Sequence, residues 1–478
     1  MKTNWLVVML GIWLMALTGM ASTHYVVTNG TPGVTSADPY TNWATAGTSI
    51  LEVVNAAMTN TEPRIVWVTN GTYYFTNGVS ITNALTIQSV NGRSNTIFNG
   101  NYPVFSNYCF YINPGSTTST IDGFTITNFA VTNIVNFGAI YATAIGSGRS
   151  KIINCLVTGN RGKHPSGGSD AGGIQINNTD VTNCIIRGNT AQRYGGGIRV
   201  GDNSIVCDSL IEGNSCGTEF VGGGVYFGGQ NSTISNCAVI NNIAADGGGI
   251  CFYSSKSGRT IINCVITGNT AKGYNSTYSG QGGGIGFQLD CSIPPLIQNC
   301  TINGNFATNS GGGISGPNFI LRNCLFSGNV ARTNAGGVLC QTGIVESCTI
   351  VSNTAGVSGG GLYFSTVSVT GQNNIVYYNS AGVSANNFTN TTGNTGLNYS
   401  CVTPAVDGIR NITNDPALKD LSGGNCRLRM SSPCVNAGTN QNWMTNAVDL
   451  EGNARILNGI VDMGAYETIL WQGTIYRF

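Results

Sequence analysis

One phrase recurs along most of the chain and decides the fold. Residues 261–285 read IINCVITGNTAKGYNSTYSGQGGGI, and residues 345–362 read VESCTIVSNTAGVSGGGL. Each copy has a Cys in a first apolar stretch, then an Asn, then a variable segment and a run of Gly. The asparagine recurs every 24–36 residues, at Asn160, Asn189, Asn214, Asn242, Asn269, Asn305, Asn329 and Asn353. A period of this length is typical of a solenoid.

The two-residue period of a β-strand assigns the faces of each copy. Cys264 and Ile266 point to one side, and after the glycines Ile285 and Phe287 do the same, so this side is predicted to be the core. Seven cysteines share the first of these positions: Cys155, Cys184, Cys237, Cys264, Cys300, Cys324 and Cys348. No His and no C-x-x-C accompany them, so we expect a buried ladder of thiols rather than a metal site.

The repeat predicts an all-β fold, a single-stranded parallel β-helix in which successive coils lie ~4.8 Å apart. The rule for parallel crossovers favours a right-handed solenoid. Glycines allow a tight corner, and the recurring Asn is expected to adopt a left-handed turn conformation and to hydrogen bond to the Asn of the next coil.

The chain divides into four predicted segments. Residues 1–21 are typical of a cleaved secretory signal, with Lys2 before a short apolar run. Residues 22–63 hold an irregular stretch, 22–47, and one helix, in which Ser49 and Glu52 stand in capping-box relation and Leu51, Val54 and Ala57 form an apolar stripe. This helix is expected to cover the open end of the β-helix, predicted over 64–400, and a coil or cap is predicted over 401–478.

Composition excludes some functions. Charged residues make up 9% of the chain, with 21 basic against 20 acidic side chains, so no nucleic-acid partner is indicated. No later segment is apolar enough to span a membrane. We expect a secreted monomer. The chain has 16 cysteines, and Cys426 and Cys434 are close enough in sequence for a disulfide, which the sequence leaves open.

The candidates for catalysis lie in one insertion. Residues 161–170 contain Arg161, Lys163, His164 and Asp170, although such a cluster also fits a solvated loop. A glycoside hydrolase needs two carboxylates across the sugar bond. A lyase would need clustered carboxylates for Ca²⁺ and a basic residue. The acidic residues are dispersed among the coils, so no metal or other cofactor is expected, and Ca²⁺ enters only if the chain is a lyase.

A second candidate surface follows the glycines. The outward position there carries Gln175, Arg199, Tyr226 and Tyr363, with Tyr253 nearby. Aromatic side chains on an elongated sheet can stack against sugar rings. The same pattern also fits an ordinary exposed sheet.

The repeat resembles that of polymorphic outer membrane proteins, within the pectate-lyase-like β-helices. The end of the chain, with VDLEGNARILNGIVDMGAYE over 448–467, is similar to choice-of-anchor Q domain proteins. The residues matching that motif are Asp449, Gly452, Arg455, Asp462, Gly464 and Glu467. The resemblance implies an exported bacterial β-helix protein, extracellular or on the outer-membrane surface. We interpret the motif as a structural cap in which Arg455 pairs with Asp449 or Glu467.

The expected function is therefore that of a non-catalytic, adhesin-like protein that binds glycans or a cell-surface or matrix partner. The alternative is a polysaccharide lyase or glycoside hydrolase that acts on an extracellular polysaccharide.

Overall fold

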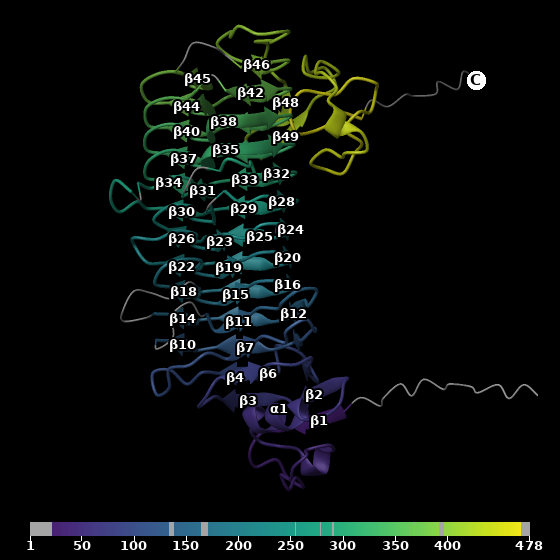
Figure 1. Ribbon diagram of the computed structural model, residues 1–478. Coiled ribbons are helices and arrows are strands. Elements are labelled where there is room, and N and C mark those ends of the chain that lie inside the picture. The colour runs from purple at the N-terminus through teal and green to yellow at the C-terminus, as the bar shows by residue number, and fades with distance from the viewer. Residues whose placement is uncertain are drawn as a thin grey trace, which may run out of the picture.

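The computed structural model describes residues 22–132, 138–163, 171–253, 255–277, 279–288, 291–366, 368–391 and 396–469. It is an elongated stack of coils with the helix α1 (Ile50–Met58) at the N-terminal end (Figure 1). Each regular coil contributes strands to three parallel sheets, A, B and C, in register with the coils before and after it. The predicted all-β parallel solenoid is confirmed, while its right-handed sense stays a prediction.

Sheet A has two columns of strands. The first column follows the glycine runs: β4 (Val79–Ile81), β7 (Phe110–Ile112), β11 (Ile140–Ala142), β15 (Ile174–Ile176), β19 (Ile198–Val200), β23 (Val225–Phe227), β27 (Ile250–Phe252), β31 (Ile285–Phe287), β41 (Leu362–Phe364) and β45 (Phe388–Asn390). The second precedes the Cys position: β1 (Ser22–Val26), β2 (Arg64–Val68), β5 (Thr86–Ser89), β8 (Thr120–Asp122), β12 (Ser150–Ile153), β16 (Thr179–Thr182), β20 (Ile205–Cys207), β24 (Thr233–Ser235), β28 (Thr260–Ile262), β32 (Leu296–Gln298), β42 (Val369–Gln372) and β46 (Leu397–Asn398). Two longer strands span both columns: β35 (Ile314–Arg322) and β38 (Val338–Glu346).

Sheets B and C complete the coil. Sheet B follows the Cys position: β3 (Gly71–Tyr74), β6 (Thr96–Asn99), β9 (Thr125–Thr127), β13 (Leu156–Thr158), β17 (Ile185–Arg187), β21 (Leu210–Glu212), β25 (Ala238–Ile240), β29 (Val265–Thr267), β33 (Thr301–Asn303), β36 (Leu325–Ser327), β39 (Thr349–Val351), β43 (Ile375–Tyr377) and β47 (Cys401–Val402). Sheet C follows the recurring Asn: β10 (Ala130–Val131), β14 (Arg161–Gly162), β18 (Thr190–Ala191), β22 (Ser215–Cys216), β26 (Ile243–Ala244), β30 (Thr270–Ala271), β34 (Phe306–Ala307), β37 (Val330–Ala331), β40 (Thr354–Ala355) and β44 (Ser380–Ala381).

The cysteine ladder is confirmed. Each of its seven thiols is at most 2% exposed, and the thiols donate to backbone carbonyls, as Cys264 Sγ does to Ile262 O at 3.3 Å. The ladder continues through polar side chains where Cys is missing. Ser209 Oγ accepts from Cys184 N at 3.1 Å, and Asn374 Oδ1 accepts from Cys348 N at 3.0 Å.

The asparagine ladder is also confirmed, with one correction. Asn242 N and Nδ2 both donate to Asn269 Oδ1, at 2.9 and 3.0 Å, and the same pattern links Asn160 through Asn379. The prediction that this Asn is left-handed is wrong. The residue before it takes that conformation, for example Gly268 with φ 66°. The ladder Asn can then turn its amide inward, where it is fully buried.

The glycine runs make close approach between coils possible. A Cβ on Gly284, the third Gly of its run, would lie 2.6 Å from Gly313 O in the next coil. The first Gly of a run is left-handed, as Gly282 is with φ 66°. The glycine run therefore has two roles: it lets neighbouring coils approach closely, and it lets the backbone turn at the corner of the coil.

The N-terminal cap differs in part from the prediction. The expected irregular stretch over 22–47 is wrong at its start, because β1 pairs in parallel with β2 and already belongs to sheet A. Helix α1 lies in the connection between these strands and contacts β1, β2 and β4, so it covers the first coil as predicted. Ser49 Oγ accepts from Glu52 N at 3.3 Å, which confirms the N-cap.

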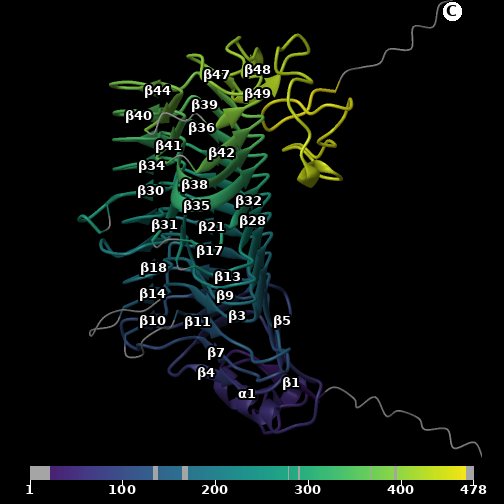
Figure 2. The ribbon, with the colours of Figure 1, turned by 45° about the horizontal axis from the view of Figure 1, so that its top comes forward.

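The C-terminal segment lies against the side of the last coils, as both views show (Figure 2). It includes the antiparallel pair β48 (Leu418–Asp420) and β49 (Asn425–Leu428). The short 3₁₀ helices are η1 (Trp43–Thr45) near the N-terminus and η2 (Asn442–Met444) in this segment. Asn373 accepts from Thr439 N at 2.7 Å, and Asn323 Nδ2 donates to Val448 O at 2.7 Å. The segment is thus held by the outward asparagines that precede the Cys position.

The candidate disulfide does not form in the structure. Cys426 and Cys434 are both buried free thiols. Cys434 instead lies in one buried apolar cluster with Cys401 of β47, so it packs the C-terminal segment onto the solenoid.

Candidate functional site

Sheet C presents two outward columns of side chains along one edge of the solenoid. In Figure 1 its strands β10 to β44 form a single line along that edge. Inward-facing alanines such as Ala191 and Ala271 are fully buried. The residues on either side of them therefore face solvent, one at the first strand position and one just after the strand.

Four exposed cations occupy these columns. Arg161 begins β14 and Lys163 follows it, so their side chains project from the same face about 7 Å apart along the strand. Lys272 and Arg332 follow β30 and β37 in the column of Lys163. Six coil steps separate Lys163 from Arg332, which is about 29 Å.

These cations have no anionic partner within the part of the chain that the structure describes. Among the described residues, none of the four forms an ion pair, and neither outward column of sheet C contains a carboxylate. The stretch between them carries neutral side chains such as Gln192 and Thr308. The edge is therefore electropositive although the whole chain has a net charge of only +1.

A pocket of about 370 Å³ lies at the Arg161 end, lined by Arg161, Gly162, Lys163, Thr190, Ala191, Gln192 and Gly217. Aromatic rings accompany the cations at both ends of the row. The Arg161 guanidinium lies 5.9 Å from the centre of the Tyr102 ring, and that of Arg332 lies 5.6 Å from the Phe306 ring.

Only half of the predicted catalytic cluster is placed by the structure. Arg161 and Lys163 lie on sheet C, whereas His164 and Asp170 fall outside the described residues. Lys272 and Arg332 were not among the residues predicted from the sequence. The signal was present, because Lys163, Lys272 and Arg332 are each the third residue after the ladder Asn.

The predicted ladder after the glycines is stacked but not open. Gln175 pairs with Arg199 and Arg199 with Tyr226 in register, and Tyr363 lies further along the same column. However, Gln175 is 3% and Tyr226 4% exposed. The expectation of an open sugar platform is wrong for these two residues.

Residues of two loops explain why Tyr226 is buried. Tyr194 and Tyr253 pack against the Tyr226 ring, at centroid distances of 4.9 and 5.4 Å. Desolvation raises the pKa of the Tyr226 hydroxyl. The column also includes Tyr111 and Tyr141, which could not be predicted from the repeat because their coils lack its full pattern.

The C-terminal motif forms one buried cluster. Arg455, fully buried, pairs with Glu467 at 3.0 Å, which is one of the two partners expected for it. Asp449 instead accepts backbone N–H groups, from Glu451 at 2.8 Å and Glu467 at 2.8 Å. Asp462 accepts from Asn436 N at 2.7 Å.

The two glycines of the motif have backbone roles. Gly452 and Gly464 have φ of 90° and 92°, and a Cβ on Gly464 would lie 2.7 Å from Ile375 of β43. With its charged groups engaged inside, this motif organises the segment and its contact with the solenoid.

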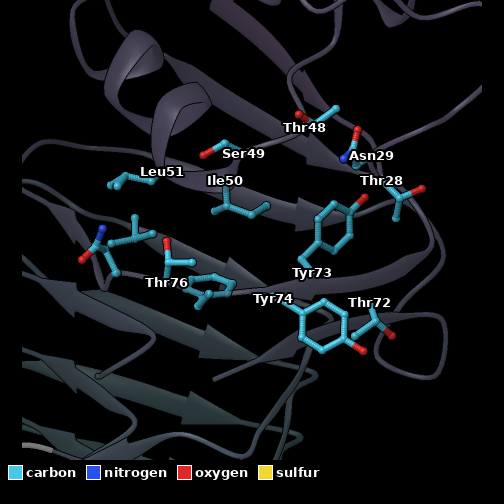
Figure 3. Close-up of a pocket in the computed structure, with 13 residues that line it drawn as sticks. Thr28, Asn29, Thr48, Ser49, Ile50, Leu51, Thr72, Tyr73, Tyr74 and Thr76 are labelled. Atoms are coloured by element: carbon cyan, nitrogen blue, oxygen red, sulfur yellow. The ribbon is translucent and has the colours of Figure 1, made fainter. Parts of the chain in front are cut away.

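A second cavity, of about 350 Å³, lies at the N-terminal rim between α1 and β3 (Figure 3). Its lining is rich in hydroxyl and aromatic side chains, and includes Ser49, Tyr73, Tyr74 and Thr76. No sequence pattern indicates this cavity, because it joins residues from three separate segments.

The donor set for a metal ion is missing from the described part of the chain. No three His, Cys, Asp or Glu side chains converge there. The residues around Arg161 therefore do not fit Ca²⁺, whose ligands are oxygens of several carboxylates and carbonyls. No helix among the described residues is long and apolar enough to cross a membrane.

The sequence matches no protein-family model and no curated protein. Similar solved structures include pectate lyase Pel9A, at 15% identity and a TM-score of 0.40, over 95% of this chain and 97% of that one. A rhamnogalacturonan lyase shows 12% identity and a TM-score of 0.34, over 91% and 95% of the two chains. The GH87 α-1,3-glucanase of Streptomyces thermodiastaticus strain HF3-3 shows 12% identity and a TM-score of 0.39, over 77% of this chain and 65% of that one. Likeness at this level says nothing about the activity of the present chain.

Proposed function

We propose that this chain is an exported protein that binds an acidic polysaccharide along sheet C. The observation that carries the proposal is the row of exposed cations Arg161, Lys163, Lys272 and Arg332 on one straight edge, none of which forms an ion pair with another described residue. Two cations that project from neighbouring positions of one face, as Arg161 and Lys163 do, repel each other, and an anion bound between them would relieve this repulsion. A linear polyanion parallel to the solenoid axis would meet all four.

The aromatic neighbours support a sugar polymer over a small anion. Tyr102 and Phe306 each lie under the guanidinium of one arginine of the row, so a sugar held by these cations would also meet apolar ring surface. The fixed spacing of the coils makes the row rigid, so binding would cost little ordering of the protein. In this proposal a free polysaccharide and a glycan on a cell or matrix surface are bound through the same chemistry.

Cleavage of the bound polymer is the second candidate function. Lys163 or Arg161, in its neutral form, would remove the C5 proton of a uronate unit, while a C4=C5 double bond forms, the C4–O bond breaks and the leaving oxygen takes up a proton, as a lyase requires. Their adjacency at the pocket favours this alternative. The dispersed carboxylates weigh against the two-carboxylate mechanism of a hydrolase.

Titration of the full-length chain with polygalacturonate, and with dextran as the neutral comparison, tests the proposal. We expect binding of polygalacturonate only, and about fivefold weaker binding for Lys163→Ala or Lys272→Ala, which corresponds to about 1 kcal/mol. Lys419→Ala is the matched control, because Lys419 is exposed on β48 and away from sheet C. Equal affinity for both polymers, or an equal loss in the control, would reject the proposal.

The same mixtures decide between binding and cleavage. Unsaturated products, followed by their ultraviolet absorbance, would establish a lyase if they disappear in both Arg161→Ala and Lys163→Ala. Binding with no change in polymer length would leave a non-catalytic binder.

A further inference from the structure

The cavity at the N-terminal rim has walls from three segments. Thr28 and Asn29 follow β1, residues 48–51 include the first turn of α1, and residues 72–77 run along and beyond β3. In Figure 3, Tyr73 and Tyr74 lie on the β3 side, across from Ser49 and Ile50. The volume of about 350 Å³ is within the range of small-molecule sites.

One aromatic side chain of the cavity wall, Tyr74, is not packed into the core. Tyr73 is 5% exposed, and its hydroxyl donates to Thr69 O at 3.1 Å. Phe75 packs on Phe98 in the core. Tyr74, in contrast, is 65% exposed, and its side chain makes no hydrogen bond or ring contact with any described residue.

The polar lining is neutral and largely unengaged. Within the described part of the chain, no side-chain hydrogen bond is made by five of its members: Asn29, Thr48, Thr72, Thr76 and Asn77. No charged residue lines the cavity. The helix end is not an anion site here, because Ser49 Oγ already accepts from Glu52 N and Glu52 places a negative charge in the first turn.

We propose that this cavity binds one hexose unit of a neutral oligosaccharide. The C–H face of a pyranose would stack on the Tyr74 ring, and its hydroxyl groups would exchange hydrogen bonds with the threonine and asparagine side chains. A charged ligand would find no counter-charge in the lining, and an apolar ligand would leave these polar groups unsatisfied. A neutral polyhydroxylated ring can both stack on the aromatic side chain and hydrogen bond with the polar lining.

The site is separate from the acidic-polysaccharide row. The β3 coil precedes the β13–β14 coil by three steps, about 14 Å, and contains none of the four cations. The inference therefore does not depend on the function proposed for sheet C.

Saturation-transfer NMR on the full-length chain tests the inference. The probes are neutral tetrasaccharides: cellotetraose, maltotetraose, laminaritetraose, mannotetraose and β-1,4-galactotetraose. We expect saturation of the ring protons of at least one probe. That signal should be lost in Tyr74→Ala and kept in Tyr74→Phe, which retains the ring.

Two controls make the test specific. Tyr274→Ala removes another exposed tyrosine, at 56% exposure, and should leave the signal unchanged. Lys163→Ala should also leave it unchanged, even where it weakens polygalacturonate binding. The inference is overturned if no probe gives a signal with the unmodified chain, if the signal survives in Tyr74→Ala, or if Lys163→Ala abolishes it.

Discussion

Asn269 shows how one buried amide joins three coils. Its Oδ1 accepts from Asn242 N and Nδ2, and its Nδ2 donates to Val239 O at 2.9 Å and to Asn305 Oδ1 at 3.0 Å. Every donor and acceptor of the side chain is used, and no water can replace it because the residue is fully buried. The ladder is therefore cooperative, with each Asn depending on the next.

We expect Asn269→Ala to destabilise the chain by about 3 kcal/mol or more, since several buried groups would lose their partners at about 1–3 kcal/mol each. The measurement is urea unfolding followed by circular dichroism. Asn458→Ala is the control, because Asn458 is exposed and its substitution should change stability by less than about 0.5 kcal/mol. Equal midpoints for the two variants would show that the ladder contributes no stability.

Glu467 gives the C-terminal segment a pH dependence. Burial raises the pKa of this carboxyl from 4.5 to about 8, against the lowering effect of Arg455. Between these two values the folded form keeps a proton that the unfolded chain has lost, so stability falls as pH rises through this window. We expect the urea midpoint of the transition that releases the segment to fall between about pH 5 and about pH 8.

Glu467→Gln carries the neutral form at every pH and should flatten this dependence. Near pH 5 its midpoint should match that of the unmodified chain. A parallel pH profile for the two proteins would show that Glu467 does not titrate in this window.

At the scale of single residues, the sequence predicted the ladders formed by residues that recur at the same position of the repeat. The Cys and Asn ladders follow directly from their spacing, as at Cys264 and Asn269. The conformation of the Asn could not be predicted, because a Gly-Asn pair offers two residues that tolerate positive φ. Burial decides between them: the side chain that turns inward is the one with an amide.

At the scale of elements, glycine is required for different reasons at the corner before sheet C and in the glycine run. Gly188, before Asn189, has φ 61° and nothing within 4 Å of its missing Cβ. Gly284 has no positive φ, but a Cβ there would lie 2.6 Å from Gly313 O. The first position restricts backbone conformation, while the second restricts the space between coils.

The two positions should therefore respond differently to substitution. Gly188→Ala should cost about 1–2 kcal/mol, the penalty of a left-handed residue with a Cβ. Gly188→Asn should cost less, since Asn241 occupies the equivalent position with φ 56°. Gly284→Ala should cost more than either, because backbone would have to move.

Thermal unfolding of these three variants measures the order. If Gly284→Ala were as mild as Gly188→Asn, the contact between coils would not be the reason for the glycine run.

Also at the scale of elements, periodicity predicted the columns of strands but not which outward side chains are buried by residues of other segments. The position of Tyr226 in an outward column was predicted correctly, yet Tyr194 and Tyr253 from neighbouring coils bury it. Such contacts join segments outside the repeat, so no local pattern records them. The row of Lys163, Lys272 and Arg332 was predictable in principle, because all three hold one repeat position.

Across the whole molecule, charge is sparse and its placement matters more than its sum. The chain has 21 basic and 20 acidic side chains, so its net charge cannot attract a polyanion strongly. None of the described acidic residues stands in the outward columns of sheet C, and some are held in ion pairs such as Arg322 with Glu346. Sheet C is left with four cations in a line, which makes its affinity for a polyanion sensitive to salt.

We expect the logarithm of the polygalacturonate binding constant to fall linearly with the logarithm of salt concentration, with a slope between about −2 and −4 if most of the four cations displace a counterion. Removing one contact in Lys163→Ala should reduce the magnitude of the slope by about one. Lys419→Ala changes the net charge equally but should keep the slope of the unmodified chain. If both lysine variants gave the same slope, the attraction would come from the net charge of the molecule, and the row on sheet C would not be the binding surface.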